Sequence, residues 1–533
     1  MSAAELKAQG NALFGAKNFA EAGKKYSKAI EASDEASDAK GLAVLYANRA
    51  ACRLSLKRYM DAQSDAKKAT ELDPKYSKAF ARLATAQDAM AQYWLSEHAW
   101  KSALDALPAA GLSAAEQAQK AQYEAAWQAA RAAVERQKNT PMMGKDAIII
   151  TGEGRMPWDL AAAMLPSFRA QKNMRSSAWV IHHAYEDFMQ GVRSINKLTV
   201  VDPTTGATTG LLGLTNGIMR DSRVVHFTDQ DFLKKYNKQI IFEATARRAW
   251  MEGGPEVIIK SALERQRTEG WNATRPALSL TIRGWLMRGV IDAGARQKHD
   301  VAVEIFKRSL DVLRSLRESW ILVPREDRGI IFEDSFLFGI QNMYLEALMQ
   351  SMASNRNINA VGLEELYQES DRLIREVDDV LRTPRGDPVD PGFLGSFYLY
   401  PRGRGYAWVF FRFYYNQMSR LNPDQKHEFC RKAAQAYSKA ADSYPEDDEQ
   451  HPWFLNCAVG NMLTANSFPL RETLDVMKRI RLSAPKAKQI WERSSLSASG
   501  MWGILEGTGK QEDVLRNMVT QGKYTLNGCV GAS

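Results

Sequence analysis

Small and aromatic residues recur along the first 137 positions of the chain, at spacings that place them on one face of successive helices. Ala22, Tyr26 and Ala29 are separated by four and three residues, which is the spacing of neighbours along an α-helix. A comparable series of small residues begins at Ala43 and begins again at Ser77, 34 residues later. The pattern therefore predicts a row of similar helical hairpins.

The composition of this region supports stacked helices. Residues 1–137 contain 39 alanines and only two prolines, so strong helix formers follow one another almost without a breaker. A period of 34 residues is that of the tetratricopeptide repeat (TPR), whose units are helical hairpins. Three units fit, and the first offset is 40 residues because Ser33–Asp38 lengthens one turn. Ser113 and Glu116 match a capping box, which predicts a capping helix that ends near Gln137.

Residues 138–227 differ from the repeats. Two short runs, Ala147–Ile150 and Leu198–Val201, are rich in β-branched residues and predict strands. Glycines predict loops around these strands; they are Gly206, Gly210, Gly213 and Gly217. We therefore expect a small, loop-rich insert of mixed α/β character.

The helical pattern resumes near residue 228 and continues to residue 533. Two segments there match the spacing of a TPR second helix; they are Ala433, Tyr437, Ala440 and Pro445, and Ala302, Phe306 and Ser309. A stretch rich in proline and glycine, Thr383–Gly405, predicts a long loop. The expected fold is all-α: a TPR-type helical solenoid at 1–137, the mixed insert at 138–227, and a second, degenerate helical-repeat region at 228–533.

The composition is that of a soluble globular protein, with 45% hydrophobic and 25% charged residues. The net charge of +9 suggests an acidic partner. Residues 1–137 contain 19 Lys and Arg against 16 Asp and Glu, so this region is only mildly basic, and the net charge does not indicate where a binding site lies. Four scattered cysteines indicate a reducing compartment. The N-terminus lacks the apolar core of a signal peptide, and no run approaches the ~18 apolar residues of a membrane span. We expect a cytoplasmic protein without a membrane partner.

Five polar side chains lie at matching positions on the first helices of the three units. They are Lys7 and Asn11 in the first unit, Asn48 in the second, and Lys78 and Arg82 in the third. First helices line the concave groove, which is the usual binding surface of a solenoid. Because lysine and arginine pair with carboxylates and asparagine donates hydrogen bonds, three cations and two amides there form a receptor for carboxylates.

This pattern resembles the carboxylate-clamp TPR family of co-chaperones, and the segment Gly10–Phe14 is similar to the family's Gly-Asn-x-x-Phe. The resemblance covers about residues 3–107, with the cap to residue 137. It implies binding of a peptide that ends in Glu-Glu-Val-Asp, the C-terminal tail of the seventy- and ninety-kilodalton heat-shock chaperones. By this analogy, the lysines and asparagines of the set hold the carboxylates of the terminal aspartate, and Arg82 attracts the acidic residues before it.

Two patterns resemble cofactor or metal sites only weakly. The segment Thr151–Arg155 follows a β-branched run as a phosphate loop does, but Pro157 stands where a dinucleotide fingerprint needs its third glycine. We interpret this segment as a turn before a helix. Four residues of types that bind metal ions occur in one part of the chain: His427, Cys430, His451 and Cys457. That set lacks a recognised zinc spacing, and we interpret Cys430 as a core residue.

Two further segments carry polar or aromatic residues without a sharper pattern. His182, His183 and Glu186 indicate a polar helix edge. The stretch Phe397–Tyr415 interleaves arginines with aromatics, as single-stranded nucleic-acid platforms do. Its aromatic residues also recur at the spacing of a buried helix face; they are Trp408, Phe411 and Tyr415. We therefore favour a core helix preceded by a loop that contains Arg402–Gly405.

The expected function is that of a non-enzymatic co-chaperone or adaptor. Its N-terminal clamp would bind a chaperone tail, and its C-terminal helical region would bind a client or a second partner. We expect no catalytic residues, metal ligands or cofactors, and no nucleic-acid partner. Two alternatives stay open. An enzyme with its active site in the C-terminal region would show a pocket with convergent titratable residues, and an RNA-associated scaffold would show one contiguous positive face outside the clamp.

Overall fold

The computed structural model describes residues 1–35, 38–139, 155–197, 209–226, 231–354, 360–383, 390–409 and 426–529. Their regular secondary structure is helical throughout, which confirms the predicted all-α class. The chain forms two compact units: residues 1–147 with 244–328, and residues 148–243 with 329–533. The division into three sequence segments made above stays a prediction. Within the described ranges, every helix is too short or too polar to bridge a lipid bilayer.

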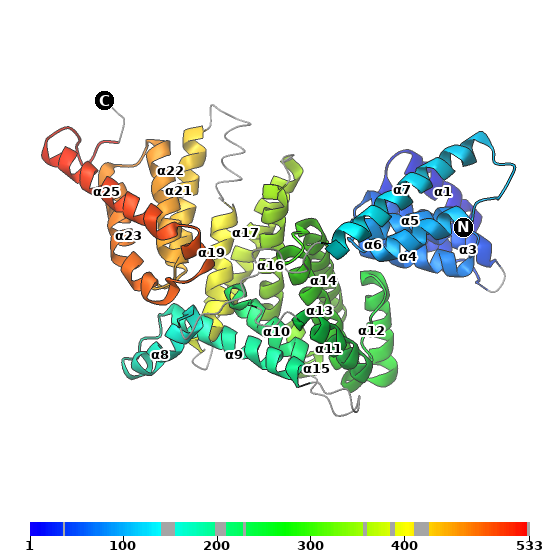
Figure 1. The fold of residues 1–533 in the computed structure, drawn as a ribbon, viewed down its shortest axis with the longest axis horizontal. Helices are drawn as coiled ribbons and strands as arrows, with labels where there is room; N and C mark the ends of the chain where they lie inside the picture. The colour runs from blue at the N-terminus through cyan, green and yellow to red at the C-terminus, as the bar shows by residue number, and fades with distance from the viewer. Residues whose placement is uncertain are drawn as a thin grey trace. The chain divides into compact units, whose positions relative to one another are not determined.

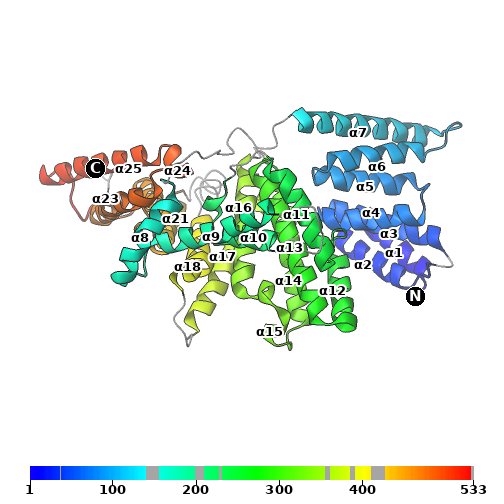
Figure 2. The same ribbon diagram turned by 60° about the horizontal axis from the view of Figure 1, so that its bottom comes forward.

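The N-terminal part of the first unit is a stack of seven helices, each in contact with the next (Figure 2). They are α1 (Ala3–Gly15), α2 (Phe19–Glu31), α3 (Ala39–Ser55), α4 (Tyr59–Leu72), α5 (Ser77–Ala89), α6 (Tyr93–Asp105) and α7 (Ala114–Asn139). The turns inside the three hairpins carry a left-handed residue at equivalent places, namely Lys17, Lys57 and Ala91. These turn residues are 40 and 34 positions apart, so the structure confirms the predicted repeat offsets.

Small residues allow the helices of each hairpin to pack closely. A Cβ atom at Gly10 of α1 would lie 2.7 Å from the ring of Tyr26 in α2, so only glycine fits there. Ala22 and Ala29 on either side of Tyr26 are buried in the same cluster. The cap also forms as predicted, because Ser113 accepts from the backbone N–H of Glu116 while the Glu116 carboxylate accepts from Ser113.

The first unit also contains four helices from a distant part of the sequence. They are α12 (Pro255–Glu269), α13 (Trp271–Gly294), α14 (His299–Ser319) and α15 (Arg325–Arg328); α11 (Phe232–Arg247) precedes them. Helices α13 and α14 form a hairpin in which a Cβ atom at Gly289 would lie 2.5 Å from the ring of Phe306. This glycine–aromatic contact repeats that of Gly10 and Tyr26. Ala302 and Ser309, predicted with Phe306 as second-helix positions, are likewise buried.

The N-terminus of α12 packs against α4 within the same unit. A Cβ atom at Gly254 would lie 2.7 Å from the backbone oxygen of Met60, so glycine lets the two backbones approach. The carboxylate of Glu256 then pairs with Arg53, and at 3.1 Å with Arg58. The repeats are therefore joined to the later helices of this unit by both close packing and ion pairs.

The regular secondary structure of the second unit is helical in its described residues, and α21 and α22 lie side by side in it (Figure 1). The helices that lie wholly in this unit are α8 (Pro157–Ala170), α9 (Ser177–Asn196), α10 (Gly210–Arg220), η1 (Ser222–Val224), η2 (Ile330–Phe332), α16 (Asp334–Ser354), α17 (Ala360–Arg382), α18 (Pro391–Leu394), η3 (Gly395–Leu399), α19 (Tyr400–Val409), α21 (Lys426–Asp442), α22 (Gln450–Ala465), α23 (Leu470–Trp491), α24 (Ser495–Ala498) and α25 (Met501–Thr520). Ala433, Tyr437 and Ala440 of α21 are buried, as the repeat spacing predicts.

The loop predicted around Gly210, Gly213 and Gly217 is wrong, because these glycines lie in α10. Their role is close packing against α9: a Cβ atom at Gly213 would lie 2.5 Å from the backbone nitrogen of Gly191, and one at Gly217 would lie 2.6 Å from that of Phe188. The glycine-rich sequence thus reflects a tight helix–helix contact. The predicted strands at 147–150 and 198–201, with Gly206, lie outside the described residues.

The long loop predicted at Thr383–Gly405 is also wrong over residues 391–405, which are helical. Arg402–Gly405, expected to precede a helix, lies inside α19. Gly403 packs against the ring of Tyr444, at 2.6 Å from an ideal Cβ, so this glycine again marks a close contact. Phe411 and Tyr415 lie outside the described residues, and the predicted core face of this helix is not tested.

A buried cluster of ionic groups joins distant segments of the second unit. Three buried carboxylates surround the Arg223 guanidinium: Asp221 at 2.6 Å, Asp448 at 2.9 Å and Glu449 at 3.2 Å. The Arg223 guanidinium also lies 3.7 Å from the centre of the Trp491 ring. Burial raises the pKa of Glu449 more than the charge of Arg223 and the hydrogen bond from Ser494 lower it, and with a smaller raising effect of Asp448 the pKa is about 7.

Candidate functional site

The five predicted clamp residues lie on the first helices of the three hairpins. Lys7 and Asn11 are on α1, Asn48 is on α3, and Lys78 and Arg82 are on α5. The structure links three of them in one hydrogen-bonded row. The Asn48 amide nitrogen donates to Asn11 Oδ1 at 3.4 Å, and Arg82 Nη1 donates to Asn48 Oδ1 at 3.3 Å. Within the described part of the chain, Lys7 and Lys78 form no hydrogen bond with this row, and their part in the site stays a prediction.

The Asn11 amide is oriented by a residue of the neighbouring helix. The Tyr26 hydroxyl donates to Asn11 Oδ1 at 2.7 Å. Burial raises the pKa of Tyr26 to about 12, so the hydroxyl keeps its proton at neutral pH. Asn11 Oδ1 therefore accepts from both Tyr26 and Asn48, and it is the NH₂ group of the exposed Asn11 side chain that a ligand can reach.

The predicted clamp cations differ from Arg49 in their electrostatic surroundings. Arg49, also on α3, is neutralised by the buried Asp65 at 2.8 Å. Among the described residues, no carboxylate lies within 4.0 Å of the charged groups of Lys7, Lys78 or Arg82. These three cations are thus available to an external anion, whereas Arg49 serves the structure of the repeats.

A pocket of about 480 Å³ adjoins the clamp between α5 and α7. Its lining residues come from α5, α6 and α7: Lys78, Ala81, Arg82, Thr85, Trp100, Ala115, Ala118, Gln119, Gln122 and Tyr123. The sequence predicts the two cations, but it predicts α7 only as a capping helix and not as a wall of this pocket. A signal was present, because Ala115, Ala118 and Gln122 recur at helical spacing on one face of α7.

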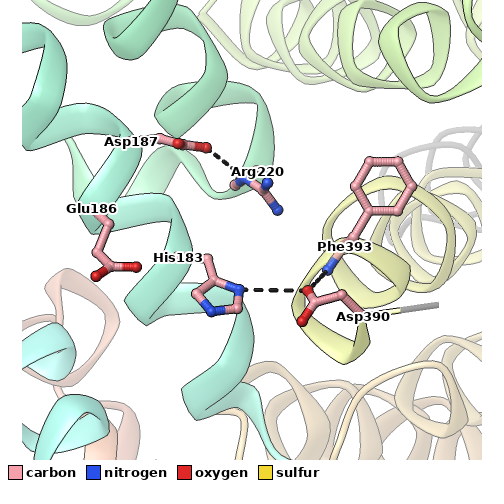
Figure 3. Close-up of a pocket in the computed structure, with 6 residues that line it drawn as sticks. All are labelled: His183, Glu186, Asp187, Arg220, Asp390 and Phe393. Atoms are coloured by element: carbon pink, nitrogen blue, oxygen red, sulfur yellow. Dashed lines mark hydrogen bonds and ion pairs between the residues drawn. The ribbon is translucent and has the colours of Figure 1, made fainter. Parts of the chain in front are cut away.

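A second pocket, of about 430 Å³, lies in the other unit (Figure 3). It is lined by His183, Glu186, Asp187, Arg220, Asp390 and Phe393. Four of its titratable groups form two pairs: Arg220 Nε donates to Asp187 at 2.6 Å, and His183 Nδ1 lies 3.4 Å from an Asp390 oxygen. Glu186 pairs instead with His182, which does not line the pocket. The pocket brings titratable residues together, as the enzyme alternative requires, so that alternative stays open.

The histidines and cysteines that were considered as metal ligands lie near backbone oxygens or in the core. The ring nitrogens of His427 and His451 face backbone oxygens, Ala465 O at 3.1 Å and Ala441 O at 2.9 Å. Cys430 is buried, in agreement with its interpretation as a core residue. Within the described part of the chain, no three His, Cys, Asp or Glu side chains are arranged to hold a metal ion.

The stacked hairpins with a polar row along their first helices define the N-terminal region as a TPR-type helical solenoid. No family model matches the chain. Heat shock protein STI1 of Saccharomyces cerevisiae is 38% identical over 105 residues, which are 20% of this chain and 17% of STI1. The small glutamine-rich tetratricopeptide repeat-containing protein 2 of the same yeast is 34% identical over 152 residues, which are 28% of this chain and 41% of the relative.

A third relative, the Hsp70/Hsp90 co-chaperone CNS1 of Saccharomyces cerevisiae, is 42% identical over 86 residues, which are 16% of this chain and 21% of CNS1. The chain thus spans less than half the length of each of these relatives. Among solved structures, yeast Tom70 aligns with 98% of both chains at 16% identity. The TM-score of that alignment is 0.25, which is too low to support an argument.

Proposed function

We propose that this protein is a co-chaperone or adaptor whose N-terminal clamp binds the acidic C-terminal tail of a heat-shock chaperone of the seventy- or ninety-kilodalton class. The observation that carries the proposal is the hydrogen-bonded row Asn11–Asn48–Arg82 on three successive first helices. Such a row presents amide donors and one guanidinium to a single extended ligand. The relative named Hsp70/Hsp90 co-chaperone supports a chaperone as the partner.

The proposed mechanism is electrostatic capture of a terminal carboxylate. Lys7 and Lys78 supply point charges, and Asn11 and Asn48 donate hydrogen bonds that fix the position of the terminal aspartate. Arg82 already donates one N–H to Asn48, and its remaining donors face the acidic residues upstream. Since these cations are at least partly exposed, salt screens their attraction over about 8 Å at physiological ionic strength. We propose in addition that the C-terminal helical region binds a client or a second partner.

The test is a titration of the full chain with a fluorescent peptide ending in Glu-Glu-Val-Asp. We expect Lys78→Ala and Arg82→Ala each to weaken binding about tenfold or more, because a hydrogen bond to a charged group contributes about 1.5–3 kcal/mol. Lys24→Ala is the matched control: it removes the same charge from α2, where Lys24 pairs with Glu21. Unchanged affinity in the two clamp variants would overturn the proposal, as would equal binding of a peptide without its last four residues.

A further inference from the structure

The pocket of the second unit is lined by side chains from α9, α10 and the region of α18 (Figure 3). We infer that this pocket binds the cationic side chain of a lysine or arginine of a partner polypeptide. This assignment rests on the proposed function, because it specifies the chemistry by which the helices after the repeats recognise a client or second partner. It also gives α9 and α10 a part in that recognition.

The charges that line this pocket do not cancel. Arg220 Nε donates to Asp187 at 2.6 Å, so these two groups neutralise each other. Glu186 lies 3.5 Å from a ring nitrogen of His182, and its side chain is 61% exposed. Burial lowers the pKa of His182, so this ring is mostly uncharged at neutral pH. The carboxylate of Glu186 therefore keeps a negative charge that its histidine neighbour does not balance.

A second carboxylate, that of Asp390, is held in place at the start of α18. Its Oδ1 accepts from the backbone N–H of Phe393 at 2.8 Å and lies 3.4 Å from His183 Nδ1. A Cβ atom at Gly392 would lie 2.6 Å from that ring nitrogen, so glycine lets α18 approach α9 closely. Among the described residues, no donor bonds to Oδ2. This oxygen is thus available to a donor from a ligand.

An aromatic ring completes the lining. Phe393 is half-buried, and its ring centre lies 5.0 Å from that of Phe397. The volume of about 430 Å³ is within the range of ~300–1,000 Å³ that is usual for ligand pockets. Lysine and arginine carry a positive group at the end of an apolar stem. Such a side chain places its charge near the carboxylates and its stem against the ring.

An anion and a metal ion match this pocket less well than a basic side chain does. The six lining residues include three carboxylates and one guanidinium, so an anion is repelled. Within the part of the chain that the structure describes, no three His, Cys, Asp or Glu side chains are arranged to hold a metal ion. An ammonium or guanidinium group needs only acceptors within reach of its N–H groups, and the carboxylates of Glu186 and Asp390 supply them.

The test is saturation-transfer difference NMR of the full chain with three tripeptides. They are acetyl-Gly-X-Gly-amides in which X is lysine, arginine or norleucine; norleucine keeps an apolar stem without the charge. We expect the two basic peptides to bind at least about threefold more tightly than the norleucine peptide. Glu186→Gln and Asp390→Asn should each weaken binding of the basic peptides about threefold, because each removes one charge and keeps the shape of the side chain. Asparagine also retains the hydrogen bond from the backbone of Phe393.

The control is Glu506→Gln, which removes one exposed carboxylate from α25 of the same unit, outside the pocket. Affinity for the basic peptides should be unchanged in this variant. Equal binding of the three peptides overturns the inference, and so does a preference for the basic ones that survives in the double variant of Glu186→Gln and Asp390→Asn. Failure of the proposed clamp would appear instead in the titration with the Glu-Glu-Val-Asp peptide, so the two failures are distinguishable.

Discussion

At the scale of single residues, Tyr26 shows how one side chain serves both the core and the candidate site. Its ring lies against Gly10, where no Cβ atom fits, and its hydroxyl donates to Asn11 at the clamp. The position of the hydroxyl therefore depends on how closely α1 and α2 pack. The exposed Asn11, a residue of the proposed clamp, is in this way oriented by Tyr26, whose exposed fraction is 2%.

We predict that Tyr26→Phe weakens binding of a Glu-Glu-Val-Asp peptide about fivefold with little loss of stability. The ring still fills its space, but Asn11 loses the hydrogen bond that orients its amide, and such a bond contributes about 1 kcal/mol. Isothermal titration calorimetry measures the affinity. Tyr76→Phe, at a half-buried position outside the clamp, is the control and should bind as the unsubstituted chain does. Equal affinity of Tyr26→Phe would show that Asn11 needs no such support.

The sequence predicts the helix and the face on which each clamp residue lies, because repeat spacing determines both. It does not predict the bonds of Asn48 with Asn11 and with Arg82, since these depend on side-chain rotamers and on the distance between successive hairpins. The sequence does not predict the role of the Tyr26 hydroxyl either. The repeat spacing places the ring in the core, but it does not determine where the hydroxyl group points.

At the scale of elements, glycines determine how closely helices approach. In α10, Gly213 and Gly217 face Gly191 and Phe188 of α9 at distances that leave no room for a methyl group. Elsewhere in the same unit, Gly503 in α25 has no heavy atom within 4 Å of an ideal Cβ. The same residue type therefore has opposite energetic roles in two helices.

We predict that Gly217→Ala destabilises the second unit by about 1–3 kcal/mol, because the added methyl group overpacks a backbone contact. Gly503→Ala should instead stabilise it by about 0.5–1 kcal/mol, because alanine loses less conformational freedom in a helix than glycine does. Urea unfolding followed by circular dichroism measures both changes. A stabilised Gly217→Ala variant would contradict the close packing of α9 and α10.

Close packing at these glycines also explains why two loops predicted from the sequence are helices in the structure. Local propensity makes glycine a helix breaker, and on that basis both Gly210–Gly217 and Arg402–Gly405 were expected to be loops. Tertiary packing reverses the preference, because the closeness of α9, or of the Tyr444 ring, compensates the conformational cost. The three N-terminal hairpins were predictable since their period repeats, whereas a close contact between two unrelated helices leaves no period to detect.

At the scale of the whole molecule, the ionic cluster around Arg223 ties together segments that are far apart in the sequence. Asp448 accepts from both Arg223 and the Tyr400 hydroxyl, and Ser494 donates to Glu449. Arg404 adds a second positive charge near Asp221, but the three buried carboxylates still outnumber the two guanidinium groups. Protonation of Glu449 relieves this imbalance, which agrees with its raised pKa of about 7.

We predict that stability falls with rising pH because of Glu449. Its pKa is raised on folding, so its contribution is fully present below about pH 4.5 and is lost as the pH rises through about 7; the loss is about 3 kcal/mol at most. In Glu449→Gln this pH-dependent contribution to stability is absent, because glutamine does not titrate. The difference in unfolding temperature between Glu449→Gln and the unsubstituted chain should therefore grow from pH 5 to pH 9. The exposed Glu492→Gln is the control and should show a constant difference.

The ion pairs of Glu252 and of Glu256 in α12 have a practical consequence for work with fragments of this protein. Arg53 and Glu256 are 203 positions apart, and Glu252 likewise pairs with Lys67. A recombinant fragment that ends with α7 would lack both glutamates, and the basic groups that they neutralise, which include Arg58, would then add to the positive potential of the repeats. Affinities for acidic peptides measured on such a fragment would overestimate those of the intact chain, most strongly at low ionic strength.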